Sequence, residues 1–330
     1  MTASPRPVNT SPKPRAPVLL PAFIVLIGLA LRLIMLGQDV RFHPDEALFA
    51  AQARLISHQG DMLLRTTDLD KPPLTFYITA LSFRVWGSTE FAARLPNVLF
   101  SGLSVAVLFA LARTLYHDPQ IAAAAALLYA FSPYDLAFAA TTFTDIQATF
   151  WILIACLWAA QDRWRWAGIA GALIFAAKSN ALLFVPLILA LGITRQAHSE
   201  WTWKDITRRL LAFAGALAAG IALVIGWDIS RSPRSFLDLG YTRNYPGRLI
   251  RSDEVGTRLE AWTRWLETVT GSPVLNGLLI VAVIVWLAWG LWRGRSRSAA
   301  LDAQIAGFGL AFLAWHWLIA FNTYVRYLHP

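Results

Sequence analysis

The residues best suited to chemistry lie in one polar stretch between two apolar segments, residues 41–73. Near its start, the adjacent acids Asp45 and Glu46 follow a His-Pro step and open a segment with the pattern of an amphipathic helix. A carboxylate in a partly desolvated pocket can serve as a general base toward a hydroxyl or an amine, so both acids are candidate catalytic residues. The simpler alternative is that they only favour the helix dipole, which is worth under about 1 kcal/mol.

The same stretch ends in DLDKPP, residues 68–73, which places a lysine beside acids and before two prolines. Proline restricts the backbone of the residue that precedes it, so the position of Lys71 is constrained. We interpret Lys71 as a point-charge contact for a phosphate group and Asp70 as a residue that shapes the same substrate-binding pocket. An ordinary solvated turn explains these residues equally well.

Three further charged residues stand at the expected ends of apolar segments. Asp145 opens one of them in TTFTDIQATFW, where Thr144 or Asp145 would suit a helix N-cap. A carboxylate at a membrane edge is costly, which also makes Asp145 a candidate catalytic residue. Lys178 and Arg326 are cations at the expected outer boundary. Each alone suits a membrane anchor, whereas together with Lys71 they could bind an anionic headgroup.

The sequence leaves metal dependence open. Asp45, Asp70 and Asp145 could gather a divalent metal ion or act without one, and the sequence indicates no other cofactor. The histidines have no metal-ligand spacing, and with Cys156 as the single cysteine a zinc site is not expected. The chain has neither a phosphate-binding loop of the GxxxxGK[ST] kind nor a GxSxG motif, so nucleotide hydrolysis and serine hydrolase chemistry are not supported.

Composition predicts an all-α multi-pass membrane protein. Hydrophobic residues make up 56% of the chain and charged residues 15%, and the apolar residues come in long runs. We expect a disordered cytoplasmic tail over residues 1–17 and a transmembrane domain over 18–330 with about nine spanning helices. The predicted spans are 18–36, 95–115, 120–138, 146–161, 165–177, 180–194, 208–227, 274–292 and 303–322. The fifth and sixth of these could form a tight hairpin that turns at residues 178–180.

The charge distribution predicts the orientation. With the N-terminus in the cytoplasm, nearly the whole excess of +9 falls on the cytoplasmic side, as the positive-inside rule requires. This accounts for the basic excess without nucleic acid as a partner. Two loops then lie on the outer face, the catalytic loop 38–86, with interfacial helices such as 74–86, and the Arg-rich loop 228–273. Arg32, near the end of the first span, is expected to reach the interface.

Five segments resemble, in this order, the polytopic glycosyltransferases of the GT-C fold. They are HPDEALFAAQA, DKPPLTFYITALSFRVWGSTEFAARLPNVLFSGLSV, TTFTDIQATF, AAKSNALLFVP and NTYVRYLHP. The closest branch is the protein O-mannosyltransferase superfamily, which includes the bacterial lipid A aminoarabinose transferases. The resemblance covers most of the chain from about residue 20 onward.

The resemblance implies a membrane enzyme that moves a sugar from a polyprenyl-phosphate donor to a protein or lipid acceptor on the outer face, with inversion. Asp45 matches the acid proposed as catalytic base, and Glu46 is its neighbour in the motif. Asp70 and Lys71 match an acid–lysine pair whose lysine is thought to hold the carrier phosphate. Asp145 matches a second acid near the outer end of a later helix.

The resemblance includes one further match and has two departures. Arg326 matches the arginine of an RY element, which would contact the phosphate or the acceptor. Phe49 stands where many members have tyrosine, so one hydroxyl contact is missing. The sequence stops at Pro330, where members continue with further helices, so we expect either a short variant or a fragment.

Two alternatives to the enzyme stay open. A transporter or flippase for a lipid-linked sugar would use the same outer cations without bond breaking, but it should carry polar residues deep in several helices and often an internal repeat. The ionisable groups are expected at the outer helix ends, and no repeat is visible, which favours the enzyme. The second alternative is an inactive truncated remnant.

Overall fold

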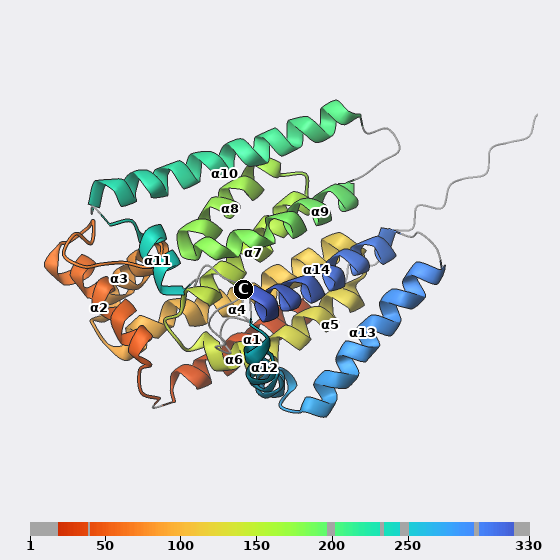
Figure 1. The fold of residues 1–330 in the computed structure, drawn as a ribbon, viewed down its shortest axis with the longest axis horizontal. Coiled ribbons are helices and arrows are strands. Elements are labelled where there is room, and N and C mark those ends of the chain that lie inside the picture. Colours follow the sequence, from red (N-terminus) through yellow and green to blue (C-terminus); the bar gives the residue numbers. More distant parts are fainter. Residues whose placement is uncertain are drawn as a thin grey trace, which may run out of the picture.

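A computed structural model describes residues 19–38, 40–196, 202–231, 234–244, 251–293 and 297–319. Within these ranges the chain forms helices and no strand (Figure 1). They are, in order, α1 (Leu19–Leu36), α2 (Pro44–Gln59), α3 (Leu74–Trp86), α4 (Glu90–Tyr116), α5 (Pro119–Ala130), α6 (Pro133–Ala139), α7 (Thr144–Ala160), α8 (Trp164–Ala177), η1 (Ser179–Phe184), α9 (Val185–Gln196), α10 (Trp203–Arg231), α11 (Phe236–Asn244), η2 (Ser252–Glu254), α12 (Val255–Thr270), α13 (Pro273–Arg293) and α14 (Arg297–Ile319).

The long helices pack side by side in one bundle. α8 packs between α10 and α7, α7 packs on α4 and α9, and α4 packs on α1 and α5. The short helices α2, α3 and α11 gather at one end, on the left of Figure 1. We call this the site end, formed by α2, α3, α11, the N-terminus of α7 and the C-terminus of α8. The far end is where the chain turns from α7 into α8.

Small residues let α8 and α10 approach closely. A Cβ atom on Gly168 would lie 2.3 Å from the carbonyl oxygen of Phe213, and one on Gly220 would lie 2.3 Å from the Cβ of Ala172. In a membrane, lipid tails are as apolar as side chains, so burial of apolar surface does not drive helices together. They associate instead through close packing at small residues. Either glycine replaced by alanine would force the two helices apart.

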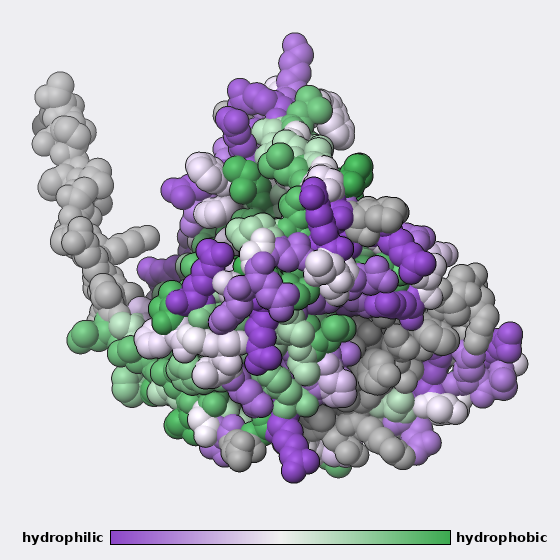
Figure 2. All heavy atoms as spheres, turned by 90° about the vertical axis from the view of Figure 1, so that its left-hand side faces the viewer, coloured by the Kyte–Doolittle hydropathy of each residue, from purple (hydrophilic) through white to green (hydrophobic). Residues whose placement is uncertain are grey.

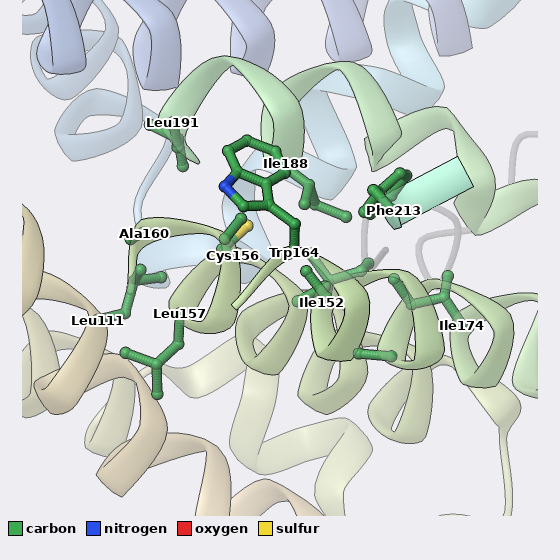
Figure 3. Close-up of a cluster of buried hydrophobic side chains, with 14 of the residues drawn as sticks. Leu111, Ile152, Cys156, Leu157, Ala160, Trp164, Ile174, Ile188, Leu191 and Phe213 are labelled. Atoms are coloured by element: carbon green, nitrogen blue, oxygen red, sulfur yellow. The ribbon is translucent and has the colours of Figure 1, made fainter. Parts of the chain in front are cut away.

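The main apolar core joins α4, α7, α8, α9 and α10. Figure 3 shows the indole of Trp164 lying among Cys156, Ile152 and Ile188. A second core lies at the site end and includes Phe49 of α2, Phe76 of α3 and Phe236 of α11, together with Leu64, Leu69, Phe143 and Phe175. The second core therefore fixes the polar loops around the candidate site.

The protein is a multi-pass membrane protein. Five helices in the described ranges are long and apolar enough to cross a membrane, or six if the bent pair α5–α6 counts as one span. α7, α8 and the apolar part of α13 are shorter apolar helices. The predicted helix at 74–86 is confirmed as α3, and each predicted span coincides with one or two helices within a few residues.

Two details of the prediction were wrong, and one loop contains helices that were not predicted. The span expected at 120–138 is broken into α5 and α6 with a bend of 55°, because Ser132 caps a new helix whose first residue is Pro133. The outer loop 228–273 contains α11 and α12. The chain does turn at Lys178 into η1, but α8 and α9 do not pack as a hairpin, because α9 packs mainly on α7 and α14.

Arg32 does not reach an interface. Its side chain is fully buried and forms an ion pair with Asp135, and its Nη1 also donates to the carbonyl oxygens of Gly28 at 2.8 Å and Ala130 at 3.2 Å. Ser101 Oγ and Tyr129 OH donate to the same carboxylate at 2.6 and 2.7 Å. We call Arg32, Ser101, Tyr129 and Asp135 the Arg32 cluster. It places ionisable groups inside the bundle, contrary to expectation, and joins α1, α4 and the α5–α6 break.

Candidate active site

The turn before α7, residues 140–143, is the point where the elements of the site end meet. The backbone N–H of Thr142 donates to Glu46 Oε1 at 3.1 Å, which joins this turn to the start of α2. The rings of His43 and Phe143 also meet edge to face, with centroids 5.6 Å apart. The two acidic motifs, nearly 100 positions apart in the sequence, therefore lie next to one another.

Glu46 is a structural link between three segments. Its side chain is 5% exposed and pairs with Arg94 of α4 at 3.2 Å. It also accepts from the backbone N–H of His43 at 3.0 Å, which completes a capping box at the start of α2. Arg94 in turn donates to the carbonyl oxygen of Val40 at 2.9 Å and lies over the ring of Phe42. These contacts join the Asp45-Glu46 pair to the start of α4.

Asp45 has a different environment from its neighbour. Its side chain is 37% exposed, and one carboxylate oxygen lies 3.9 Å from His43 Nδ1. His43 Nδ1 also accepts from the Asp45 backbone N–H at 3.2 Å. Adjacent residues on a helix point in directions about 100° apart, so burial of Glu46 leaves Asp45 facing outward. Of the two acids, Asp45 has the accessible carboxylate.

The first turn of α7 is held in place by buried amides. Asn97 donates to the carbonyl oxygens of Thr141 and Phe143 at 2.8 and 2.7 Å, and it accepts from Gln147 at 3.0 Å. Gln147 accepts from Thr75 of α3 at 3.3 Å. The predicted N-cap was wrong: the helix begins at Thr144, Phe143 holds the N-cap position, and no side chain in the described ranges caps it.

Asp145 and Lys178 form a close pair across α7 and α8. The Lys178 ammonium lies 2.6 Å from Asp145 Oδ1, and the two side chains are 12% and 7% exposed. The pair forms because α7 starts and α8 ends at the same level of the bundle. Charge-assisted pairs of this kind are strong when they are withdrawn from water. The structure thus brings together two residues that the sequence singled out separately.

Asp70 and Lys71 lie on the loop before α3. Lys71 Nζ lies 3.3 Å from Asp70 Oδ2, and Arg243 of α11 approaches the same oxygen at 3.7 Å. α11 runs very close to this loop, since a Cβ on Gly240 would lie 3.0 Å from the carbonyl oxygen of Asp70. The Lys71 side chain is 26% exposed. One acid and two cations therefore share this part of the site end.

Residues at the end of α10 anchor the same loop, and the sequence reasoning missed them. The buried guanidinium of Arg231 donates to the carbonyl oxygens of Leu64 and Thr67 at 3.0 and 3.2 Å. Trp227 Nε1 donates to the hydroxyl of Tyr77 at 2.9 Å, and that hydroxyl donates to the carbonyl oxygen of Met62. The available signal was the Trp-Asp-x-x-Arg pattern at the end of an apolar helix.

Asp61 accepts several hydrogen bonds at the start of the loop between α2 and α3. Its carboxylate accepts from the backbone N–H groups of Arg65 and Thr66 at 2.9 and 3.0 Å and from the Thr66 hydroxyl at 2.7 Å. Burial acts to raise the pKa of Asp61, but these hydrogen bonds outweigh it and hold the pKa below its ordinary value.

Metal ligands do not converge in the described part of the chain. No group of three Asp, Glu, His or Cys side chains comes together there. The metal site suggested for Asp45, Asp70 and Asp145 is therefore not assembled, because Asp145 pairs with Lys178 and Asp70 with Lys71 and Arg243. Arg326 lies outside the described residues.

Figure 2 faces the site end, and hydrophilic residues predominate over the middle of this face. Hydrophobic residues are interspersed among them and gather along one lower edge. A surface that presents both kinds of side chain suits an amphipathic ligand, with a charged group over the polar region and an apolar chain beside it.

Comparison with known proteins agrees with this architecture. Residues 70–227, from Asp70 to Trp227 in the last turns of α10, match the dolichyl-phosphate-mannose-protein mannosyltransferase family. An undecaprenyl phosphate-alpha-4-amino-4-deoxy-L-arabinose arabinosyl transferase of Pseudomonas paraeruginosa is 29% identical over 208 residues, 58% of this chain and 36% of the relative. The corresponding transferase 1 of Pseudomonas fluorescens is 26% identical over 304 residues, 86% of this chain and 53% of the relative.

The fold agrees as well. The crystal structure of ArnT from Cupriavidus metallidurans bound to undecaprenyl phosphate superimposes with a TM-score of 0.63 and 18% identity, covering 96% of this chain and 59% of that one. The chain thus has the GT-C fold, and its sequence is similar to the protein O-mannosyltransferases and the aminoarabinose transferases. This GT-C chain spans about a third to about half of the length of the curated relatives that it matches.

Proposed function

We propose that this GT-C chain is a glycosyltransferase that moves a sugar from a polyprenyl-phosphate carrier to a lipid or protein acceptor. The relatives named for transfer from undecaprenyl phosphate support the carrier class. The observation that carries the proposal is that an accessible carboxylate, Asp45, shares the site end with Lys71 and Lys178. Sugar transfer needs a base for the acceptor and cations for the departing phosphate.

In this mechanism Asp45 accepts the proton of the acceptor's hydroxyl or amine as that group attacks the anomeric carbon. The bond from the anomeric carbon to the phosphate oxygen breaks on the opposite side, so the configuration inverts. Lys71 and Lys178 stabilise the negative charge that returns to the carrier phosphate. Asp145 holds Lys178 in position through their ion pair. Glu46 acts by holding Asp45 and the turn before α7 in position, because its own oxygens are bonded to Arg94, Thr142 and His43.

The proposed orientation places the site end on the outer face of the inner membrane and the N-terminus in the cytoplasm. The positive-inside rule supports this, because the basic excess then falls at the far end. A cysteine-accessibility assay checks the orientation. Single cysteines introduced at Asp68 and at Arg165 should react with a membrane-impermeant reagent from opposite sides, in a Cys156→Ala background.

The proposed base is tested by replacing Asp45 with Asn. Transfer should fall by about 10²- to 10⁴-fold, the contribution of a general base, while membrane insertion and thermal stability are unchanged. Asp68→Asn is the matched control, because Asp68 is an exposed acid on the same outer loop whose nearest cation is Arg234. Equal activity of Asp45→Asn and wild type would overturn the assignment of Asp45.

The sugar and acceptor are identified in cells. In a strain that lacks the gene, mass spectrometry of lipid-linked sugars and glycoconjugates should find an accumulated donor and a missing product. If a wild-type gene restores the normal levels of donor and product and the Asp45→Asn gene does not, both compounds are assigned to this site. Normal levels of every such compound in the deletion strain would contradict the transferase.

A further inference from the structure

A basic and aromatic cavity lies at the far end, where the chain turns from α7 into α8 and meets the start of α10. Its volume is about 320 Å³. Four arginines and one aspartate line it, a net of three positive charges, together with the indoles of Trp164 and Trp166. α7 has 17 residues and so separates this cavity from the candidate active site by about 25 Å. The cavity is thus a separate feature of the molecule.

The floor of the cavity is a fixed structure built around Asp162. This residue has a left-handed backbone conformation, with φ of 62°, and its carboxylate accepts from Trp164 Nε1 at 2.7 Å and from Arg209 at 2.6 and 3.1 Å. The hydrogen bonds from Arg209 hold the pKa of Asp162 below its ordinary value although burial opposes them, so the residue is charged at neutral pH. Trp164 is 3% exposed and packs into the main core.

The remaining cations of the cavity are available to a ligand. Arg163 and Arg165 are exposed and make no ion pair within the described residues, and Arg208 lies 3.9 Å from Asp205 on a side chain that is 77% exposed. α8 begins at Trp164, and no described side chain caps its first N–H groups. Guanidinium groups beside an uncapped helix start are the donors that phosphate oxygens prefer.

An apolar wall adjoins these donors. Trp166 is 56% exposed, and its ring lies against that of Trp158 with centroids 6.0 Å apart. Indole rings concentrate at the level of lipid headgroups, where one edge is wet and the other is apolar. A ligand with a phosphate and an adjoining acyl chain would contact both the arginines and this wall.

We propose that this cavity binds the phosphate of an anionic phospholipid in the leaflet at the far end. Arginines that served only to orient the chain in the membrane would need neither a cavity nor a carboxylate that fixes one of them in place. The inference concerns lipid binding and stands apart from the proposed transferase, which uses residues at the opposite end of α7 and α8.

The test is native mass spectrometry of the purified full chain titrated with phosphatidylglycerol or phosphatidylcholine. Phosphatidylglycerol should bind in preference, and Arg163→Gln/Arg165→Gln should weaken its binding on the order of tenfold, because each arginine near an anionic lipid contributes attraction. Arg113→Gln/Lys204→Gln is the matched control. It removes two exposed charges near the same end but outside the cavity, and it should change binding by less than about twofold.

A second variant, Trp166→Ala, keeps every charge and should weaken phosphatidylglycerol binding several-fold by removing the apolar wall. Equal losses of phosphatidylglycerol binding in Arg163→Gln/Arg165→Gln and in the control Arg113→Gln/Lys204→Gln would overturn the proposed site. Competition by glycerol 3-phosphate at the concentration where phosphatidylglycerol binds would overturn the lipid as its ligand and indicate a soluble phosphate compound. Equal binding of both lipids would also contradict the proposal.

Discussion

Two groups of charged side chains in this bundle differ in how far they are sealed from solvent. In the Arg32 cluster, the side chains of Arg32 and Asp135 are 0% and 3% exposed and every carboxylate oxygen has a partner. At the site end, the side chains of Asp45, Lys71 and Lys178 are 37%, 26% and 12% exposed. A charged side chain inside a membrane protein usually marks a functional site. Here solvent access separates the buried Arg32 cluster, which we call the scaffold, from the more exposed residues of the site end.

The same contrast separates two adjacent residues. Glu46 is buried and has partners on α4 and on the turn before α7, as in the scaffold, whereas the Asp45 carboxylate is accessible. The difference teaches that two neighbours in one motif can have opposite environments, one buried and bonded and the other accessible. Variants that change either class should therefore have different signatures in stability and in activity.

The largest effect is expected from Arg32→Met, which breaks the sealed pair. An unpaired Asp135 carboxylate left inside the bundle should lower the free energy of unfolding by about 3–5 kcal/mol. Thermal unfolding in detergent measures the loss. Arg32→Met/Asp135→Leu should recover much of it, since replacing both partners removes the buried charge; a double variant as unstable as the single one would show that the cluster is not acting as a pair.

Glu46→Gln should come next. The neutral amide weakens the bonds to Arg94 and to Thr142, so we expect a loss of about 1.5–3 kcal/mol in unfolding free energy together with reduced transfer. Asp45→Asn at the adjacent position should reduce transfer alone. If both variants kept full stability, the distinction between scaffold and site would fail at this motif.

Lys71→Gln tests the accessible group and should affect function alone. Loss of one cation that stabilises the departing phosphate should lower kcat/KM for the donor by about tenfold, or about 1.4 kcal/mol, mainly through kcat. Arg54→Gln is a suitable control, because Arg54 is an exposed cation of α2 bonded to Ser88 Oγ. An unchanged kcat/KM would remove Lys71 from the donor site.

The smallest effect is expected from Asp61→Asn, at about 0.5–1 kcal/mol for an exposed set of hydrogen bonds. The pKa of Asp61 is held below its ordinary value of 3.8, so its stabilising contribution is complete above that value and is lost as the pH falls through the lowered pKa. The stability difference between wild type and variant should thus be constant from pH 5 to 7 and shrink below pH 4. A difference that grew as the pH fell would contradict this account.

The sequence was informative where a local pattern determines structure. Long apolar runs located the spanning helices, and the double proline before Leu74 marked the start of α3. The break between α5 and α6 also had a local signal in Ser132-Pro133, which an unbroken apolar pattern concealed. α11 and α12 were missed because polar helices beside a membrane carry no apolar run.

Pairings between distant positions could not be read from the sequence. Arg32 and Asp135 are 103 positions apart, and Arg231 and Leu64 are 167 positions apart. Nothing near Arg32 in the sequence distinguishes a buried cation from one that reaches the interface. The candidate site could be named residue by residue through its resemblance to a family, but the roles of Glu46 and Arg231 follow only from their contacts.

Hydrogen bonds hold α10 near both of its ends. Near the start, Arg209 donates to Asp162, and at the end, Arg231 donates to the carbonyl oxygens of Leu64 and Thr67. The 22 positions from Arg209 to Arg231 therefore fix the distance between the α7–α8 turn and the first loop. Each residue of an α-helix adds about 1.5 Å and turns the chain by about 100°. An insertion or deletion of a single residue between Arg209 and Arg231 would put one of the two arginines on the wrong face, so the length of this segment is as constrained as its composition.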